Sequence, residues 1–161
     1  IYAKAPETAK IIKLARDTNK SMPSFVCEYV RKIIPDGKIA VLGVSYKGNT
    51  GDDRESPSYE VIAELEQDGY EIAVHDPHIE RDNLVSFADA IDGAKLILIL
   101  CDHDEFKHPD YELISKKMEN PIIFDTKNII YKVPDDMTLY NYGNLYTINT
   151  KWRQFSIVKA I

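Results

Sequence analysis

A polar loop that carries two cations follows the first predicted buried strand of this chain. The strand runs over Lys38–Leu42 and breaks at Gly43, and the loop ends at a helix start, Ser56-Pro57. Lys47 offers a mobile ammonium, and Arg54 offers a planar guanidinium fork that matches phosphate oxygens. Open α/β sheets bind ligands at the carboxyl ends of their strands. The loop therefore predicts a site for an anion of the phosphate or pyrophosphate type.

The same loop can also be interpreted as a solvated turn. It holds three carboxylates, those of Asp52, Asp53 and Glu55. Exposed ion pairs between such groups contribute little to stability. The dinucleotide fingerprint G-x-G-x-x-G is not matched here. Gly43 and Gly48 stand at its first and third glycine positions, but Ser45 stands at the second. We therefore expect no ordinary NAD site in this unit, and the residues alone leave the anion site and the solvated turn about equal.

Apolar periodicity predicts alternating strands and helices around this loop. The predicted strands cover 38–42, 70–75, 95–101 and 121–125, with a further strand-like stretch over 138–148. The predicted helices between them cover 58–68, 83–91 and 110–117. Two more helices, 5–16 and 21–34, precede the first strand and are separated by a break at Lys20–Pro23. The pattern predicts a Rossmann-like, doubly wound parallel sheet in a three-layer α/β sandwich, preceded by a helical arm.

Composition narrows the class of protein. The chain of 161 residues fits one domain, and its 44% hydrophobic and 29% charged residues indicate a globular protein. The net charge of -6 argues against nucleic acid as a partner. We also expect no membrane partner, because no apolar run approaches the about 18 residues that a span requires. Cys27 and Cys101 are scattered in apolar surroundings, so we expect buried free thiols and a cytoplasmic location.

The loop also resembles a known motif. Gly43 to Pro57 is similar to the pattern G-x-x-[YF]-K-x-x-[TS]-x-D-x-R-x-S-P, which opens the C-terminal, UDP-binding domain of the UDP-glucose/GDP-mannose dehydrogenase family. The residues that match are Gly43, Tyr46, Lys47, Thr50, Asp52 or Asp53, Arg54, Ser56 and Pro57. Further segments resemble the family in order: 17–23, 75–77, 102–106 and 124–128. Among the family, the chain looks most like UDP-N-acetyl-D-mannosamine dehydrogenase.

The resemblance implies a reaction and roles for particular residues. Such enzymes oxidise the C6 alcohol of a nucleotide sugar to a carboxylate with two NAD in succession. Lys47 would contact the UDP-sugar substrate, and Tyr46 would line the same site. Arg54 would reach an NAD bound by another domain. Lys127 falls near a substrate-binding arginine of some members, although a lysine cannot form a bidentate fork and can also be a solvated turn residue.

The resemblance also implies what this chain lacks. The family's N-terminal NAD-binding domain and its nucleophilic cysteine have no counterpart here, so we assign no catalytic residue. A thiol must attack the aldehyde intermediate before the second oxidation. We therefore expect an excised piece, inactive alone, with residues 1–34 as connector and dimerisation arm and residues 35–161 as the UDP-binding domain. An apolar stripe on the arm, Ile11, Ile12, Leu14 and Ala15, predicts a homodimer, and the rival is that the arm packs on its own sheet.

Two alternatives remain open from the sequence. The chain can be a stand-alone nucleotide-binding or regulatory module without redox chemistry. Within the dehydrogenase interpretation, the turn Asp125-Thr126-Lys127 favours UDP-N-acetylmannosamine weakly over UDP-glucose. Four histidines lie near aspartates, namely His75, His78, His103 and His108, but their spacing matches no metal-ligand pattern and we predict no metal.

Overall fold

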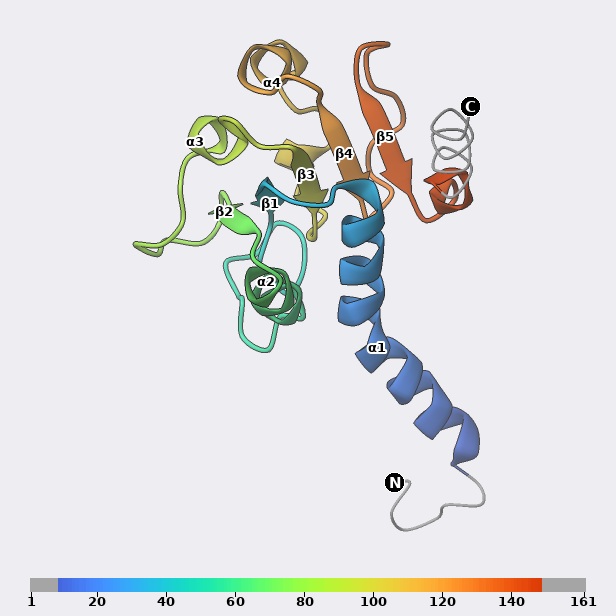
Figure 1. The fold of residues 1–161 in the computed structure, drawn as a ribbon. Helices are drawn as coiled ribbons and strands as arrows, with labels where there is room; N and C mark the ends of the chain where they lie inside the picture. The colour runs from blue at the N-terminus through green and yellow to red at the C-terminus, as the bar shows by residue number, and fades with distance from the viewer. Residues whose placement is uncertain (1–8, 149–161) are drawn as a thin grey trace, which may run out of the picture.

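Five parallel strands form the central sheet of the computed structural model, which describes residues 9–148 (Figure 1). They are β1 (Lys38–Leu42), β2 (Glu71–His75), β3 (Leu96–Ile99), β4 (Ile122–Asp125) and β5 (Thr138–Asn141). Their order in the sheet is β2-β1-β3-β4-β5, and every neighbouring pair is parallel. The order reverses between β1 and β3, and a ligand crevice is expected at the carboxyl edge of such a reversal.

Helices cover both faces of this sheet (Figure 1). Helices α1 (Lys10–Ile33) and α2 (Ser58–Gln67) lie on one face, and α3 (Phe87–Ile91) and α4 (Tyr111–Lys117) lie on the other. Successive β1 side chains alternate between the two cores: Ile39 and Val41 join the α1–α2 side, and Ala40 and Leu42 join the α3–α4 side. The predicted doubly wound three-layer sandwich is confirmed.

Helix α1 is continuous, so the prediction of two helices with a break at Lys20–Pro23 is wrong. Pro23 lies inside the helix, where a missing backbone donor costs about 3 kcal/mol. The next turns bury three side chains against α2 and the sheet, those of Val26, Cys27 and Val30. Each buried aliphatic side chain contributes roughly 1.5–3 kcal/mol, so packing outweighs the proline. Ser21 caps no second helix, and its hydroxyl donates to the Thr18 carbonyl oxygen at 2.8 Å.

The first half of α1 projects away from the sheet (Figure 1). Ile11 is 83% exposed and Leu14 is 68% exposed, and Ile12 and Ala15 are exposed beside them. This is the apolar stripe that the sequence predicts as a contact surface. Only the second half of the helix packs on the chain's own sheet. The division into residues 1–34 and 35–161 stays a prediction.

The predicted helix over 83–91 is shorter than expected and begins at Phe87. Val85 donates its backbone N–H to the Val74 carbonyl oxygen of β2 at 2.9 Å, which holds it beside the strand. Ser86 then caps α3, because its hydroxyl accepts the Asp89 backbone N–H at 3.1 Å. A strand-edge contact and a cap therefore delay the helix start.

The strand-like stretch over 138–148 is only partly a strand. Strand β5 ends at Asn141, whose backbone N–H donates to the Asn144 side-chain oxygen at 2.8 Å. A turn follows and leads into η3, a 3-10 helix over Leu145–Thr147. The remaining predicted strands and helices agree with the structure to within two residues at each end. The ambiguous segment 151–161 lies outside the described residues.

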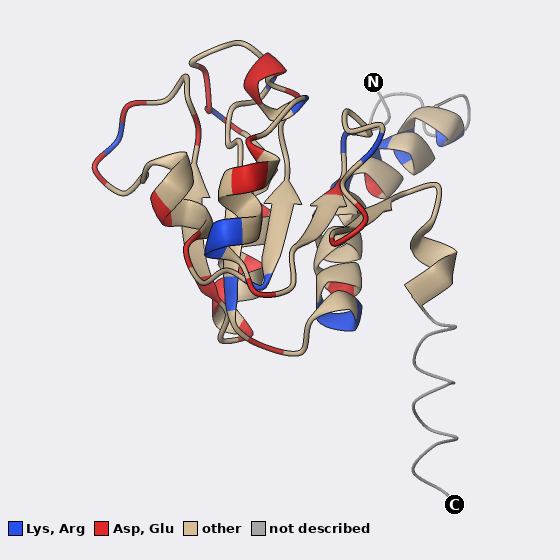
Figure 2. Ribbon diagram, turned by 90° about the horizontal axis from the view of Figure 1, so that it is seen from above, with Lys and Arg blue, Asp and Glu red and all other residues tan. Residues whose placement is uncertain are grey.

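Acidic and basic residues are interspersed over the helices and loops of residues 9–148, whereas the strands are almost entirely uncharged (Figure 2). Within the same residues, no helix combines the length and apolar character that crossing a membrane requires. The charge therefore lies on the connections, where the candidate site residues are also found.

Candidate functional site

The loop after β1 starts with a glycine that lies against the next strand's end. Gly43 has a φ of +89°, and a Cβ at that position would lie 2.3 Å from the Cβ of Cys101. Further along, the Tyr46 backbone N–H donates to the Asp52 carbonyl oxygen at 2.8 Å and closes the loop. Tyr46 is 57% exposed and Lys47 is also exposed. The loop thus presents an aromatic ring and a cation to solvent at the carboxyl edge of the sheet.

A buried carboxylate holds the start of this loop. Asp76 follows β2, and its Oδ2 accepts the backbone N–H groups of Val44 at 2.8 Å and Ser45 at 3.0 Å, and the Ser45 hydroxyl at 3.0 Å. Its Oδ1 accepts the His78 backbone N–H at 2.9 Å. Burial raises the pKa of Asp76, but these hydrogen bonds and one from His103 outweigh it and hold the pKa below its ordinary value. Asp76 is therefore an ionised anchor for the loop.

His103, which follows β3, connects that carboxylate to the middle of the loop. Its Nε2 lies 3.1 Å from Asp76 Oδ2, and its Nδ1 lies 2.9 Å from the backbone nitrogen of Asn49. A backbone N–H can only donate, so Nδ1 accepts and the ring proton is on Nε2. The side chain of Asn49 also donates to Asp104 Oδ2 at 3.0 Å and accepts the Asp104 backbone N–H at 3.0 Å. One network therefore ties three strand ends together.

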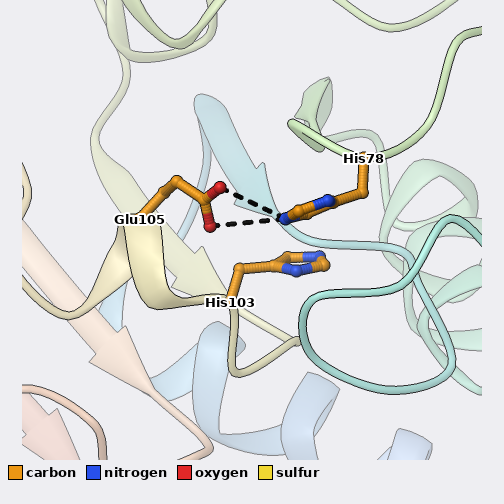
Figure 3. Close-up of side chains that lie close together, drawn as sticks. All are labelled: His78, His103 and Glu105. Carbon is orange, nitrogen blue, oxygen red and sulfur yellow. Dashed lines mark hydrogen bonds and ion pairs between the residues drawn. The ribbon is translucent and has the colours of Figure 1, made fainter.

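His78, His103 and Glu105 bring nitrogen and oxygen atoms within 4.8 Å of one another (Figure 3). His78 Nε2 lies 3.2 Å from a Glu105 oxygen, and the two imidazole rings stack with centroids 4.6 Å apart and an interplanar angle of 28°. Both ring nitrogens of His103 already have hydrogen-bonding partners. Stacked rings also do not aim their lone pairs at a shared ion. We therefore propose no metal for this cluster.

Arg54 has its guanidinium fork occupied by a neighbour. Its Nε and Nη2 donate to the two oxygens of Asp52 at 2.8 and 2.7 Å. The hydrogen bond from Arg54 is the main cause that lowers the pKa of Asp52 to about 2. The Arg54 side chain is 84% exposed, so the pair contributes little to stability. Tyr46 and Arg54 line one open depression of about 440 Å³, together with Asp52 and Glu55.

Lys127 lies in a turn that a second buried carboxylate shapes. Asp125 ends β4 and accepts three backbone N–H groups, from Lys127 at 2.9 Å, Ile129 at 2.7 Å and Ile130 at 2.8 Å. The turn requires Asn128 at a φ of +57°, which asparagine tolerates better than most residues. The Lys127 backbone is therefore held in place, and its side chain is exposed.

Lys127 lines a cleft of about 280 Å³ between α1, α2 and the carboxyl ends of β3 and β4. Its polar lining beside Lys127 consists of Asn19, Ser58, Thr126 and Tyr142. Its apolar wall includes Met22, Val26, Val61 and Leu100. An apolar wall with a few polar groups and one cation is the ordinary composition of a small-molecule site.

The predicted site residues thus fall into separate places along one edge of the sheet. Tyr46 and Arg54 share a depression, Lys127 lines the cleft, and Lys47 lines neither of these two hollows. Sequence reasoning missed the pairing of Asp76 with His103, and it missed the contribution of α1 and of the segment after β5 to the cleft. The segments 75–77 and 102–106 carried a signal, since both resemble family motifs at strand ends.

Both cysteines are buried free thiols, as predicted. Burial is the main cause that raises the pKa of Cys27 to about 12 and that of Cys101 to about 11. Because the thiolate is the reactive form, we expect neither to react with an aromatic disulfide reagent at pH 8 in the folded chain. Both should react in 8 M urea, roughly the concentration needed for full exposure. Fast release of the chromophore from the folded chain would contradict this prediction.

A family model described as the UDP-glucose/GDP-mannose dehydrogenase family, UDP binding domain, matches residues 40–132, more than half of the chain. The chain belongs to this family. The matched range runs from β1 past the turn after β4, so it includes the loop of Lys47 and Arg54 and the turn of Lys127. The resemblance read from the motifs is therefore confirmed.

Members of the family align closely with this chain. A UDP-N-acetyl-D-mannosamine dehydrogenase of Methanocaldococcus jannaschii is 46% identical over 132 residues, which are 77% of this chain and 31% of that protein. A solved UDP-N-acetyl-mannosamine dehydrogenase of Staphylococcus aureus is 39% identical with a TM-score of 0.83, over 91% of this chain and 36% of that one. A solved UDP-D-ManNAc dehydrogenase of Pyrococcus horikoshii is 32% identical with a TM-score of 0.80, over 89% of this chain and 36% of that one. This chain spans about a third of the length of these relatives.

Proposed function

We propose that this chain is the C-terminal, substrate-nucleotide-binding part of an NAD-dependent nucleotide-sugar 6-dehydrogenase. The observation that carries the proposal is the UDP-binding family model, which matches the segments that hold Tyr46, Lys47, Arg54 and Lys127. The reaction would convert UDP-N-acetylmannosamine, or UDP-glucose, to the uronate. Relatives named UDP-N-acetyl-D-mannosamine dehydrogenase at 33–46% identity support the first sugar, and a UDP-glucose 6-dehydrogenase of Gallus gallus is 29% identical.

The substrate contacts follow from the charges along the carboxyl edge. Asp76 and Asp125 are buried there, and their carboxylate oxygens accept hydrogen bonds from backbone N–H groups. They therefore hold loops instead of repelling a diphosphate. Lys47 and Lys127 are exposed cations on the loops so held. In this proposal they bind the anionic part of the UDP-sugar as point charges, and the ring of Tyr46 lines the same site.

The chemistry itself is proposed to come from residues outside this chain. Oxidation to the carboxylate needs a thiolate that attacks the aldehyde. Burial holds Cys27 and Cys101 in the thiol form, so neither suits that role. The depression around Arg54 is open and includes two carboxylates, which does not fit NAD without a second domain. Arg54 would reach the cofactor only after exchanging Asp52 for a phosphate.

The first half of α1 is proposed as the homodimer contact. Its exposed stripe of Ile11, Ile12, Leu14 and Ala15 is apolar and lies on a projecting helix. A cytoplasmic location also stays a prediction.

A stand-alone nucleotide-binding or regulatory module remains the second candidate. It is favoured by the raised pKa of both cysteine thiols, which leaves neither as a reactive nucleophile. The coding sequence upstream of Ile1 discriminates the two candidates, because the dehydrogenase requires a glycine-rich βαβ unit there.

Calorimetric titration with UDP tests the proposed binding. We expect Lys47→Ala to weaken UDP binding by about tenfold, since a charge-assisted contact to phosphate contributes about 1.5–3 kcal/mol. Lys116→Ala is the matched control, because Lys116 is an exposed lysine in the last turn of α4 and lines neither the depression nor the cleft. This variant should bind UDP as the unmodified chain does. Tighter binding of GDP than of UDP would contradict the UDP assignment, and equal UDP affinity for both variants would contradict the role of Lys47.

A further inference from the structure

We propose that His103 is a positioning residue that sets the conformation of the Lys47 loop through its Nδ1 atom. The proposal rests on the proposed function in one respect, namely that Lys47 contacts the substrate. His103 itself would touch no substrate, because its side chain is fully buried. Its effect would pass through the backbone of the loop.

The imidazole ring of His103 is held in one orientation from four sides. Nε2 donates to Asp76 at 3.1 Å, and Nδ1 accepts from the Asn49 backbone at 2.9 Å. His78 stacks on one face at a centroid distance of 4.6 Å, and the ring of Phe106 makes an edge contact at 5.3 Å. A ring flip would place the Nε2 proton against the Asn49 N–H, so the ring has only one fitting orientation.

The two residues after Lys47 rest on the segment that carries His103. Gly48 donates its backbone N–H to Asp102 Oδ1 at 3.1 Å, and a Cβ on Gly48 would lie 2.5 Å from the Asp102 carbonyl oxygen. Asn49 has a φ of +58°, a conformation that costs about 1 kcal/mol and persists only where contacts hold it. The bond to Nδ1 is such a contact. The position of Lys47 is therefore decided by a side chain 54 positions from Asn49.

Charged and titratable groups surround the His103 ring. Asp76 meets the Nε2 edge of the ring, His78 stacks on its face and pairs with Glu105, and Asp104 follows His103 on the same segment. The neutral ring, protonated on Nε2, accepts from Asn49. A proton on Nδ1 would place a donor against the Asn49 N–H, so the contact requires the tautomer with its proton on Nε2.

Two substitutions of His103 separate the roles of its nitrogens. In His103→Asn the side-chain oxygen falls near the Nδ1 position and can still accept from Asn49. In His103→Gln the amide falls near Nε2 and can still donate to Asp76, but Asn49 loses its acceptor. We expect His103→Gln to weaken UDP binding about tenfold, and His103→Asn to stay within about twofold of the unmodified chain. His108→Gln, at an exposed histidine, is the control and should change nothing.

Nitrogen-15 NMR of the unmodified chain tests the contact without any substitution. At neutral pH the His103 ring should show the tautomer with the proton on Nε2. The Asn49 amide should exchange with solvent at least about a hundredfold more slowly than an open loop amide, and this protection should fall in His103→Gln. A proton on Nδ1 at neutral pH, or an unprotected Asn49 amide, would overturn the proposal.

UDP titration and amide exchange distinguish a failure of the positioning role from a failure of the proposed substrate site. If the unmodified chain binds no UDP but Asn49 is protected and loses protection in His103→Gln, the positioning role stands and the proposed substrate site is wrong. If UDP binds and His103→Gln binds it as tightly as His103→Asn does, the positioning role is wrong and the substrate site stands.

Discussion

Replacing Asp76 with asparagine should lower the free energy of unfolding by about 3–5 kcal/mol. The substitution keeps the shape of the side chain but removes the charge that four donors share on Oδ2, from Val44, Ser45 and His103. The asparagine amide would also turn an N–H group toward one set of those donors. Because Asp76 is 5% exposed, water cannot supply the lost acceptor.

Urea unfolding followed by circular dichroism measures this loss. Asp82→Asn is the matched control, since Asp82 is exposed on the loop after β2 and its change should stay within about 0.5 kcal/mol. A loss below about 1 kcal/mol for Asp76→Asn would show that the network does not anchor the loop.

The effect of Asp76 should also depend on pH. Its folded-state pKa lies below its ordinary value, so the charge stabilises the fold at pH values above the unfolded pKa, near about 4. As the pH falls through the lower folded pKa, the carboxyl is protonated and this stabilisation disappears. The difference between the unmodified chain and Asp76→Asn should therefore be full at pH 7 and should shrink below pH 4, about the unfolded value.

Gly43→Ala should cost at least about 3 kcal/mol of unfolding free energy. The backbone of Gly43 has a φ of +89°, and the added methyl would lie 2.3 Å from the Cβ of Cys101 and 3.1 Å from its backbone nitrogen. A Cβ cannot move away by rotating a side chain, so the carboxyl ends of β1 and β3 would have to separate. The loop of Lys47 starts at Gly43, so we expect this loop to become disordered when the end of β1 is displaced.

Gly69→Ala is the control that measures backbone strain without the contact to Cys101. Gly69 has nearly the same φ, +91°, but an added methyl there has no atom within 4 Å. We expect it to cost only about 1–2 kcal/mol, the strain term alone. Equal losses for the two variants in the same urea titration would mean that Cys101 does not restrict the loop.

Local sequence patterns were sufficient to predict the layers of the fold and the loops that carry the candidate site residues. Continuous apolar runs such as 96–101 are typical of strands buried on both faces, which indicates a parallel sheet between helices. The types and spacing of Lys47 and Arg54 marked the loop after β1, and its motif led to the family. These features are local, so periodicity and residue type are sufficient to find them.

Which of these groups contact one another depends on long-range packing. Packing against α2 and the sheet keeps α1 continuous through Pro23, although local propensity favours a break. A carboxylate two residues away occupies the fork of Arg54, and His103 reaches both Asp76 and Asn49. Hydrogen bonds between strand ends depend on the order and register of β2, β1 and β3. No short-range pattern encodes that order, because it arises from the packing of the whole sheet.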